Sequence, residues 1–93
     1  MKYQYISNPI KILVKYKGHF KKVIGLGHEY YNFNENIKLE KLIELLKEKY
    51  PLFKNEETFL ITINGKFIFF GIIHKTFIKD GDEVEIFPTV TGG

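Results

Sequence analysis

Histidine and acidic side chains are the residues of this sequence that could bind a metal ion or transfer a proton. His19, His28 and His74 form no i, i+4 pair, and the 93 residues include no cysteine that could join them as a ligand, so a zinc site is not indicated. The acids of "KDGDE", residues 79–83, lack the spacing of a calcium-binding loop. Asp and Gly favour turns for local backbone reasons. We therefore expect a turn at 79–83 and no metal site.

Nucleophiles and phosphate-binding loops are equally hard to find. Ser7 is the only serine and lies outside any nucleophile-elbow context. The segment "GLG", residues 25–27, is followed by no Lys-Ser or Lys-Thr pair, as a phosphate loop requires. The absence of cysteine also excludes disulfides, thiolate nucleophiles and persulfides on this chain. The sequence predicts a protein that is not an enzyme by itself and binds no cofactor.

The carboxyl end, where Gly92 and Gly93 close the segment "FPTVTGG", is the remaining place for chemistry. Glycine leaves a narrow channel unblocked and lets backbone approach a reactant closely. Five residues follow Pro88, and fully extended they span at most about 17 Å. An α-carboxylate, with an ordinary pKa of about 3.3–3.7, is ionised at neutral pH and is a poor electrophile. It would need activation by a partner, usually adenylation with ATP, although a frayed glycine end explains these two residues equally well.

Charge and composition restrict the class of protein. The formal net charge is +3, but every basic residue is lysine, and the lysines are spread along the chain. Specific nucleic-acid readers depend on arginine for bidentate contacts, so we expect no nucleic-acid partner. An apolar content of 44% is enough for one packed layer. The longest apolar stretch, residues 67–73, is too short to cross a bilayer, and we expect a cytoplasmic protein without a signal peptide.

The first half of the chain alternates short strands with one short helix. Residues 1–9 form an expected N-terminal extension that ends in the turn signal "NP". The period-2 pattern of "IKILVKY", residues 10–16, predicts a half-buried strand, and residues 28–33 predict a second. Between them, Phe20, Val23 and Ile24 lie at helical spacing, which predicts a short helix closed by Gly25.

The segment "IKLEKLIELLKEKY" predicts the main helix of the protein. Its apolar residues follow i, i+3, i+4, i+7 spacing and form one stripe: Leu39, Leu42, Ile43, Leu46 and Tyr50. Asn36 is the expected N-cap, without a capping box, and Pro51 ends the helix.

The second half of the chain returns to strands. Residues 59–63 alternate as a strand, and Asn64-Gly65 predicts a tight turn. "KFIFFGIIHKTF", residues 66–77, is apolar on both faces, which suits either a short strand with a packed loop or a surface for a partner. Residues 83–87 predict a last strand, with Val84 and Ile86 inward, that ends at Pro88.

This order of elements predicts an α+β fold. Strands and helices do not alternate regularly, so a doubly wound sheet is not expected. One helix across one mixed sheet buries all the apolar faces if the last strand returns beside the first. That arrangement is the β-grasp, or ubiquitin-like, fold. We assign the β-grasp domain to residues 10–88 and a flexible Gly-Gly tail to residues 89–93.

The carboxyl-terminal part of the sequence resembles the MoaD/ThiS family of ubiquitin-like sulfur carriers. The features that carry the resemblance are an acidic Gly turn, a strand, a proline, a linker and Gly-Gly in "KDGDEVEIFPTVTGG", with "LEKLIELLKEKYP" and "ITING" upstream. The extra helical turn in "HFKKVIGLGHEYYNF" is more similar to MoaD than to ThiS proteins. The resemblance covers residues 10–93. Departures from the family pattern are Thr89 in place of a second proline, no Thr cap before the helix, and a longer apolar segment at 66–79.

The resemblance implies a sulfur carrier with defined partners. A ubiquitin-activating-type adenylyltransferase (MoeB/ThiF-like) would use ATP and magnesium to adenylate Gly93, and a sulfur donor would convert it to a thiocarboxylate. As the small subunit of a molybdopterin synthase, the chain would insert its tail into a MoaE-like large subunit and donate sulfur to the molybdenum or tungsten cofactor.

The same resemblance implies a role for each residue near the carboxyl end. Gly93 would carry the adenylate and then the sulfur, and the residues that thread into the partner would be Pro88, Thr89, Val90, Thr91 and Gly92. Phe67 and Phe87 match hydrophobic positions that face partners, although core packing explains them equally well. Alternative functions are a sulfur carrier for thiamine or tRNA thiolation, a protein modifier joined to lysines, and a ubiquitin-like interaction domain with an inert tail.

Overall fold

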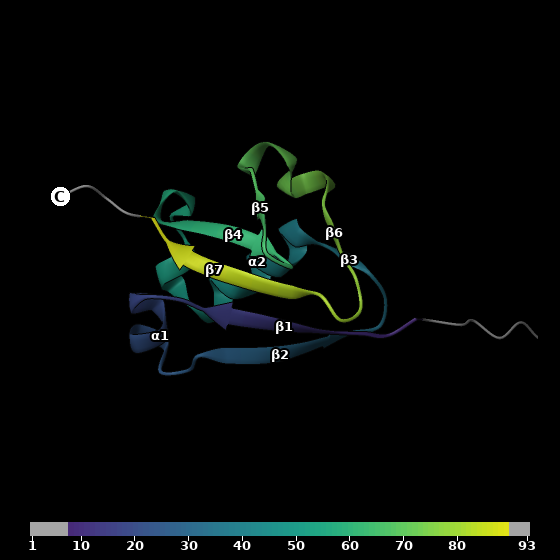
Figure 1. Ribbon diagram of the computed structural model, residues 1–93, viewed down its shortest axis with the longest axis horizontal. Helices are drawn as coiled ribbons and strands as arrows, with labels where there is room; N and C mark the ends of the chain where they lie inside the picture. The colour runs from purple at the N-terminus through teal and green to yellow at the C-terminus, as the bar shows by residue number, and fades with distance from the viewer. Residues whose placement is uncertain (1–7, 90–93) are drawn as a thin grey trace, which may run out of the picture.

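The computed structural model describes residues 8–89 of the chain, and they form a five-stranded sheet with one long helix across one face (Figure 1). The strand order is β2-β1-β7-β4-β5. The strands of this sheet are β1 (Ile10–Tyr16), β2 (His28–Phe33), β4 (Phe59–Ile63), β5 (Lys66–Ile68) and β7 (Glu83–Pro88). The helix is α2 (Leu39–Lys49). The expected α+β, β-grasp arrangement is confirmed.

The two central strands, β1 and β7, run parallel, and the other neighbours in the sheet are antiparallel. In the parallel pair Val14 lies opposite Val84 and Tyr16 opposite Ile86. The chain therefore returns at its end to the strand with which the described fold began, as the sequence predicted. Its last strand is held on both edges, by β1 and by β4.

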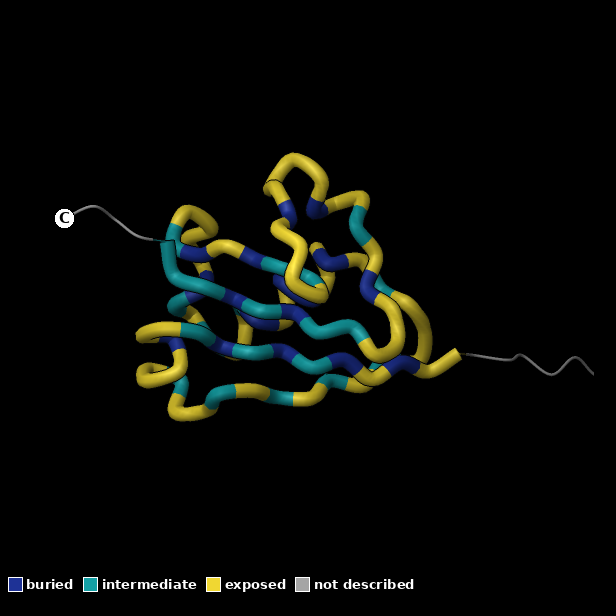
Figure 2. Tube along the Cα trace, viewed as in Figure 1, coloured by how far each residue is buried: buried dark blue, intermediate teal, exposed yellow. Residues whose placement is uncertain are grey.

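The hydrophobic core lies between the sheet and α2. Along β1 and β7 buried residues alternate with more exposed ones, as Figure 2 shows. This is the consequence of a period-2 pattern when one face of a sheet is covered. The largest fully buried side chains come from the sheet, the helix and the turns beside it: Ile12, Val14, Tyr16, Phe20, Leu39, Leu42, Phe53, Phe59, Ile78, Val84 and Ile86.

The start of α2 differs from the expectation. The N-cap is Lys38, not Asn36, and its side chain makes no capping hydrogen bond. Instead, the backbone N–H of Leu39 donates to the carbonyl of Thr76 at 2.7 Å. The cap comes from a residue far along the chain, which is why no local motif marks it. At the other end Tyr50 is the C-cap, and Pro51 opens a 3₁₀ turn, so the predicted stop is confirmed.

Short elements complete the fold. The short helix α1 (His19–Ile24) ends at Gly25, whose φ of 84° is left-handed, as expected; it buries Phe20 but leaves Val23 exposed. A second, two-stranded sheet pairs β3 (Ile37–Lys38) with β6 (Phe77–Ile78) and was not predicted. The 3₁₀ turns are η1 (Pro51–Phe53), η2 (Glu56–Thr58) and η3 (Phe70–Lys75).

The acidic turn at 79–83 is held by its own side chains. Asp82 accepts from the backbone N–H of Lys79 at 2.8 Å and from the side-chain amide of Asn64 at 2.9 Å. Asp80 accepts from the backbone N–H of Lys11 at 2.8 Å. Gly81 adopts a left-handed φ of 84°. The acidic side chains therefore stabilise the turn through hydrogen bonds, and the turn predicted at these residues is confirmed.

The apolar segment 66–77 contains the expected short strand and packed loop, and it also leaves apolar side chains exposed. It forms β5, η3 and the start of β6, and it buries Ile68 and Ile73. Phe67, Phe69 and Ile72 remain exposed. Across residues 8–89, none of the helices has both the length and the apolar character that a membrane span needs.

Candidate functional site

The end of β7 is the root of the tail, and it is fixed to the body of the protein. Pro88 still belongs to β7 and lies opposite Phe59. The backbone N–H of Thr89 donates to the carbonyl of Thr58 at 3.0 Å, and the Thr89 hydroxyl donates to the carbonyl of Glu57 at 3.1 Å. The strand thus runs one residue past its predicted end, and Thr89, expected in the flexible tail, is hydrogen-bonded to η2.

Four of the expected tail residues, Val90, Thr91, Gly92 and Gly93, lie outside the described residues. Counted from Thr89, these four residues span at most about 14 Å when fully extended. The carboxylate of Gly93 can therefore lie at most about 14 Å from Thr89, whose position is fixed by its hydrogen bonds.

Gly18 supports the root of the tail from the other side. Its φ of 59° and ψ of −140° belong to a region that residues with a Cβ rarely adopt. A Cβ at this position would lie 2.8 Å from Cγ of Pro88. The neighbouring Lys17 donates its backbone N–H to the carbonyl of Ile86 at 2.9 Å. The β1–α1 connection and η2 therefore hold the end of β7 between them.

The face of the sheet that α2 does not cover carries the two predicted docking residues. Phe87 of β7 lies opposite Leu60 of β4, and Phe67 of β5 lies opposite Thr62 of β4. Diagonal neighbours on one face of a sheet lie within reach of aromatic side chains. We call Leu60, Phe67 and Phe87 the sheet patch. Phe67 is exposed and Phe87 is half-buried, and neither belongs to the buried core, so the structure does not favour the core-packing alternative.

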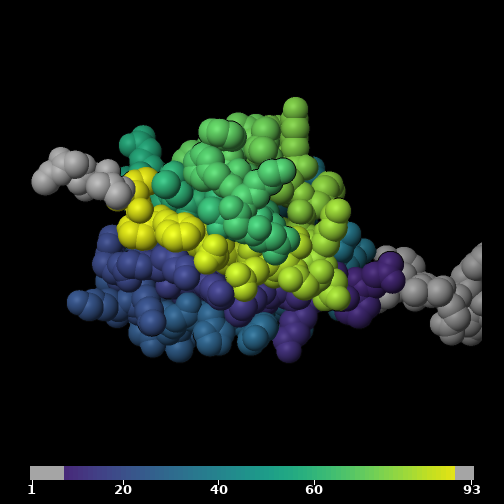
Figure 3. All heavy atoms as spheres, in the orientation of Figure 1, coloured from purple at the N-terminus to yellow at the C-terminus, as the bar shows by residue number. Residues whose placement is uncertain are grey.

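Figure 3 shows this uncovered face, with the yellow end of the chain between the blue first strands and the green segment of β4, β5 and η3. The half next to β1 is polar. Lys15 pairs with Glu83 at 3.2 Å, and Lys17 pairs with Glu85 at 3.3 Å. Because these pairs are partly exposed, each contributes little to stability. The apolar half, by contrast, lies beside the root of the tail.

The histidines do not form a site. His19 packs against Phe20 with ring centroids 4.8 Å apart, His28 packs against Tyr30 at 5.8 Å, and His74 lies in η3. Within residues 8–89, no three metal-binding side chains come together in a group that could hold an ion.

A carboxylate cluster around Glu29 is the strongest electrostatic feature of the described residues, and sequence reasoning missed it. Glu29 accepts hydrogen bonds from the hydroxyls of Tyr16 at 2.6 Å, Tyr50 at 2.7 Å and Tyr31 at 3.0 Å. Lys49 donates to its second oxygen at 2.7 Å. No sequence motif marks the cluster because its members come from three elements.

The pKa values of the cluster follow from these contacts. Burial acts to raise the pKa of Glu29, but the hydrogen bonds from Lys49 and the three tyrosines outweigh it and lower that pKa to about 2. Burial, followed by the hydrogen bond to Glu29, raises the pKa of Tyr16 far above its ordinary range. The hydrogen bond to Glu29 raises the pKa of Lys49. The cluster therefore stays charged at neutral pH as a fixed ion pair surrounded by neutral phenols, which suits a structural role.

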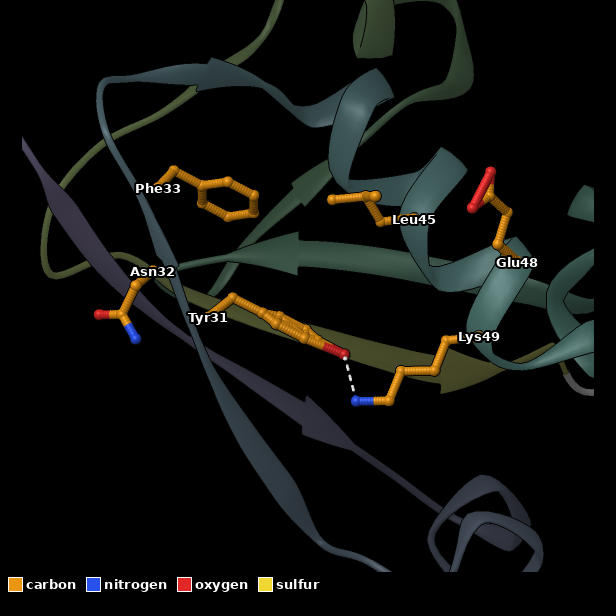
Figure 4. A pocket seen from close by; sticks show the side chains of 6 residues that line it. All are labelled: Tyr31, Asn32, Phe33, Leu45, Glu48 and Lys49. Carbon is orange, nitrogen blue, oxygen red and sulfur yellow. Dashed lines mark hydrogen bonds between the residues drawn. The ribbon is translucent and has the colours of Figure 1, made fainter.

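A groove beside the cluster runs between β2 and α2 (Figure 4). Its volume is about 550 Å³, and it is lined by Tyr31, Asn32, Phe33, Leu45, Glu48 and Lys49. In the view of Figure 4 the Tyr31 hydroxyl and the Lys49 amine lie at one end, joined by a 3.5 Å hydrogen bond. Lys49 is already paired with Glu29. The groove presents neither a free nucleophile nor a set of metal ligands.

Comparison with known proteins identifies relatives of this chain. A model of the ThiS family matches residues 14–93. Among solved structures, a putative molybdopterin converting factor, subunit 1, from Pyrococcus furiosus is 29% identical, with 87% of this chain and 99% of that chain covered and a TM-score of 0.70. Small archaeal modifier protein 1 from Methanosarcina acetivorans is 25% identical, with 92% and 99% covered and a TM-score of 0.69.

A thiamine biosynthesis protein (ThiS) from Geobacter metallireducens shares the fold at 21% identity, with 87% of this chain and 99% of that chain covered and a TM-score of 0.58. No curated protein matches the chain. The relatives agree on the fold but differ in the biological role that their names state.

Substitution of Gly18 tests the support of the tail root. We expect Gly18→Ala to lower the free energy of unfolding by about 1–3 kcal/mol, because the left-handed backbone and the Pro88 ring both oppose a Cβ. Urea denaturation measures the change. Gly71→Ala is the matched control, since a Cβ there meets nothing within 4 Å. Equal stability of the two variants would contradict the proposed contact.

Substitution of Glu29 tests the carboxylate cluster. Because the folded-state pKa of about 2 lies below the ordinary 4.5, the charge of Glu29 stabilises the fold above pH 4.5, and this contribution is lost as the pH falls towards 2. The shift corresponds to about 3 kcal/mol. We expect Glu29→Gln to be less stable than wild type by up to that amount at pH 7, with the difference shrinking between pH 4.5 and 2.

Urea denaturation at several pH values measures the difference between wild type and Glu29→Gln. Glu48→Gln is the control, because Glu48 lines the same groove but takes no part in the cluster. A difference for Glu29→Gln that does not change with pH would show that the charge of this carboxylate is not what stabilises the fold.

Proposed function

The chain belongs to the ThiS family, and from this membership we propose that it is a sulfur carrier that holds sulfur as a thiocarboxylate on Gly93. The observation that carries the proposal is the position of β7. The last strand is central in the sheet, and Thr89, which follows it, is hydrogen-bonded to the body of the protein. Four residues follow Thr89. The fold thus holds the root in place while the carboxylate reaches into another protein.

The chemistry needs two steps at the terminal carboxyl group. A carboxylate oxygen of Gly93 attacks the α-phosphorus of ATP, and pyrophosphate leaves, which gives an acyl adenylate. Hydrosulfide supplied by a sulfur donor then attacks the carbonyl carbon, and AMP leaves, which gives the thiocarboxylate. The chain supplies only the carboxylate, so an adenylyltransferase of the ubiquitin-activating type must supply Mg-ATP. The lack of cysteine fits this scheme, because the sulfur is carried on the backbone carbon.

We propose molybdopterin synthesis as the use of the sulfur, with the chain as the small subunit of the synthase. The support is the 29% identity to the molybdopterin converting factor subunit over 99% of that chain. The tail would enter a MoaE-like large subunit, where the thiocarboxylate gives its sulfur to a pterin precursor. Glycine at positions 92 and 93 suits this step, because no side chain hinders the approach of the precursor.

A protein modifier is the second candidate function. The observation in its favour is the similarity to small archaeal modifier protein 1 at 25% identity, with 99% of that chain covered. In this case the activated carbonyl of Gly93 would be attacked by a lysine amine of a target protein, and an isopeptide bond would form. Both candidates need the same activation and differ only in what attacks the activated carbonyl.

Intact mass spectrometry tests the carrier role. When the chain is incubated with the adenylyltransferase of its own organism, Mg-ATP and a sulfur donor, we expect its mass to rise by the difference between sulfur and oxygen. A variant without Gly93 should keep its mass and unfold in urea like the full chain, because β7 and Thr89 are intact. An unchanged mass of the full chain in the complete mixture would overturn the carrier role.

A second experiment separates the two candidates. The thiocarboxylated chain is mixed with the MoaE-like subunit of the same organism and a pyranopterin precursor, and we expect a dithiolene product and return of the unmodified mass. In parallel, cell extracts are searched for conjugates that disappear when Gly92 and Gly93 are deleted. Conjugates without any dithiolene product would favour the modifier.

A further inference from the structure

An apolar protrusion on η3 is the largest feature of the described residues that the proposed function leaves unused. Phe69 is 65% exposed, and Phe70 and Ile72 are each 44% exposed. We call these three residues the apolar knob. Figure 2 shows the segment as a mostly exposed arch beyond β4, and buried Ile68 and Ile73 bound the exposed residues 69–72. Contiguous exposed apolar side chains on a small protein mark interaction sites more often than scattered ones do.

The knob is anchored, so its side chains are presented in a fixed arrangement. Ile68 and Ile73 are buried on either side of it. The backbone N–H of Ile72 donates to the carbonyl of Phe69 at 3.1 Å, and the Thr76 hydroxyl donates to the carbonyl of Ile72 at 2.7 Å. Thr76 in turn caps α2 through Leu39. A surface that is already ordered loses little conformational entropy when it binds.

The knob is continuous with the sheet patch, whose Phe87 lies in the last strand, one residue before Pro88. The rings of Phe67 and Phe69 meet edge to face, with centroids 4.8 Å apart. Phe70 packs at 6.2 Å against Phe59, which is buried in the core, so this contact anchors the knob. Figure 3 shows the green atoms of this segment above the yellow strand β7. A protein that receives the tail and lies on the sheet patch therefore also meets the knob.

Charge indicates the chemistry of the surface that fits the knob. Residues 66–79 contain Lys66, Lys75 and Lys79 and no acidic residue, and all three lysines are exposed. On the α2 side of η3, Glu40, Glu44 and Glu56 line one pocket with Phe70, and Glu56 is paired with Lys47. The basic side of the knob is therefore the side that faces away from α2. The complementary surface is an apolar depression with an acidic rim, because opposite charges around an apolar centre favour association.

We propose that the knob docks in an acid-rimmed apolar depression on the adenylyltransferase that activates Gly93. The inference rests on the proposed function. Among the partners, the activating enzyme is chosen because every use of the carboxylate, for sulfur transfer or for conjugation, requires it. The knob then supplies binding free energy at a distance from the reacting atoms, so it governs how tightly the carrier binds and not how fast the bound carboxylate reacts.

Kinetics of ATP–pyrophosphate exchange test the proposal with the full chain and the adenylyltransferase of its own organism. For Phe69→Asp we expect the KM for the carrier to rise at least about tenfold with kcat within about twofold, because a central apolar contact is lost. Lys66→Glu should raise KM and weaken its dependence on salt. Gly92→Val, in the tail, should lower kcat instead.

Leu45→Asp is the matched control, since Leu45 is an exposed apolar residue of α2 on the other side of the sheet; its KM should equal that of wild type. Urea denaturation confirms that each variant is folded, and Phe69→Ala and Ile72→Ala repeat the test with milder changes. Wild-type KM values for all the knob variants would overturn the inference. No exchange with the wild-type chain would instead overturn the proposed function.

Two further measurements test whether a second copy of the chain or a lipid surface covers the knob instead. Sedimentation velocity of wild type and Phe69→Asp shows whether a second copy covers it; a wild-type dimer that Phe69→Asp dissociates would overturn the inference. Co-sedimentation with vesicles of phosphatidylcholine and phosphatidylglycerol tests a lipid surface. Vesicle binding by wild type that Phe69→Asp abolishes would also overturn the inference. A wild-type protein that is monomeric and does not co-sediment with vesicles would support docking on the enzyme.

Discussion

The parallel pairing of β1 with β7 is the constraint on which the rest of the structure depends. It places the last strand of the fold in the middle of the sheet, where both edges are hydrogen-bonded, and not at an edge. An end segment usually frays unless it is tied into a sheet in this way. The same pairing fixes the direction in which Thr89 leaves, between η2 and the connection that contains Gly18. The carboxyl end that is proposed to react therefore follows a strand that is hydrogen-bonded on both edges.

The sheet separates stability from recognition. One face is covered by α2 and carries the core, together with the Glu29 cluster that joins β1, β2 and the end of the helix. The other face is uncovered, and its apolar half leads from the tail root through the sheet patch to the knob. Since side chains on opposite faces do not touch, residues that meet partners can vary without changes in the core.

The sequence was sufficient for the parts of the fold that follow from local periodicity. Alternating residues predicted β1, β4 and β7, and the apolar stripe predicted α2, because each burial pattern repeats within one element. The N-cap of α2, the β3–β6 pair and the Glu29 cluster were missed, since each joins residues distant in sequence. Likewise, the contact of Gly18 with Pro88 spans 70 positions and has no local signal. At the candidate site, the family resemblance predicted Phe67 and Phe87 as docking residues, but only the strand register showed that both lie on the uncovered face of the sheet.

The chemistry of the chain explains why its surface must decide its biological role. A carboxylate on a glycine is the same reagent whether sulfur or a lysine amine finally attacks it, so the tail cannot distinguish between partners. Specificity must then come from contacts that the tail does not make. The sheet patch lies next to the tail root, and the knob adjoins the patch through Phe67, which the longer apolar segment 66–79 also contains. Because the activating enzyme is common to both proposed uses, the knob does not decide between them. The sheet patch is then the apolar surface beside the tail root at which the later partners would differ, while the root held by Gly18 and Thr89 would serve the activation that both uses need.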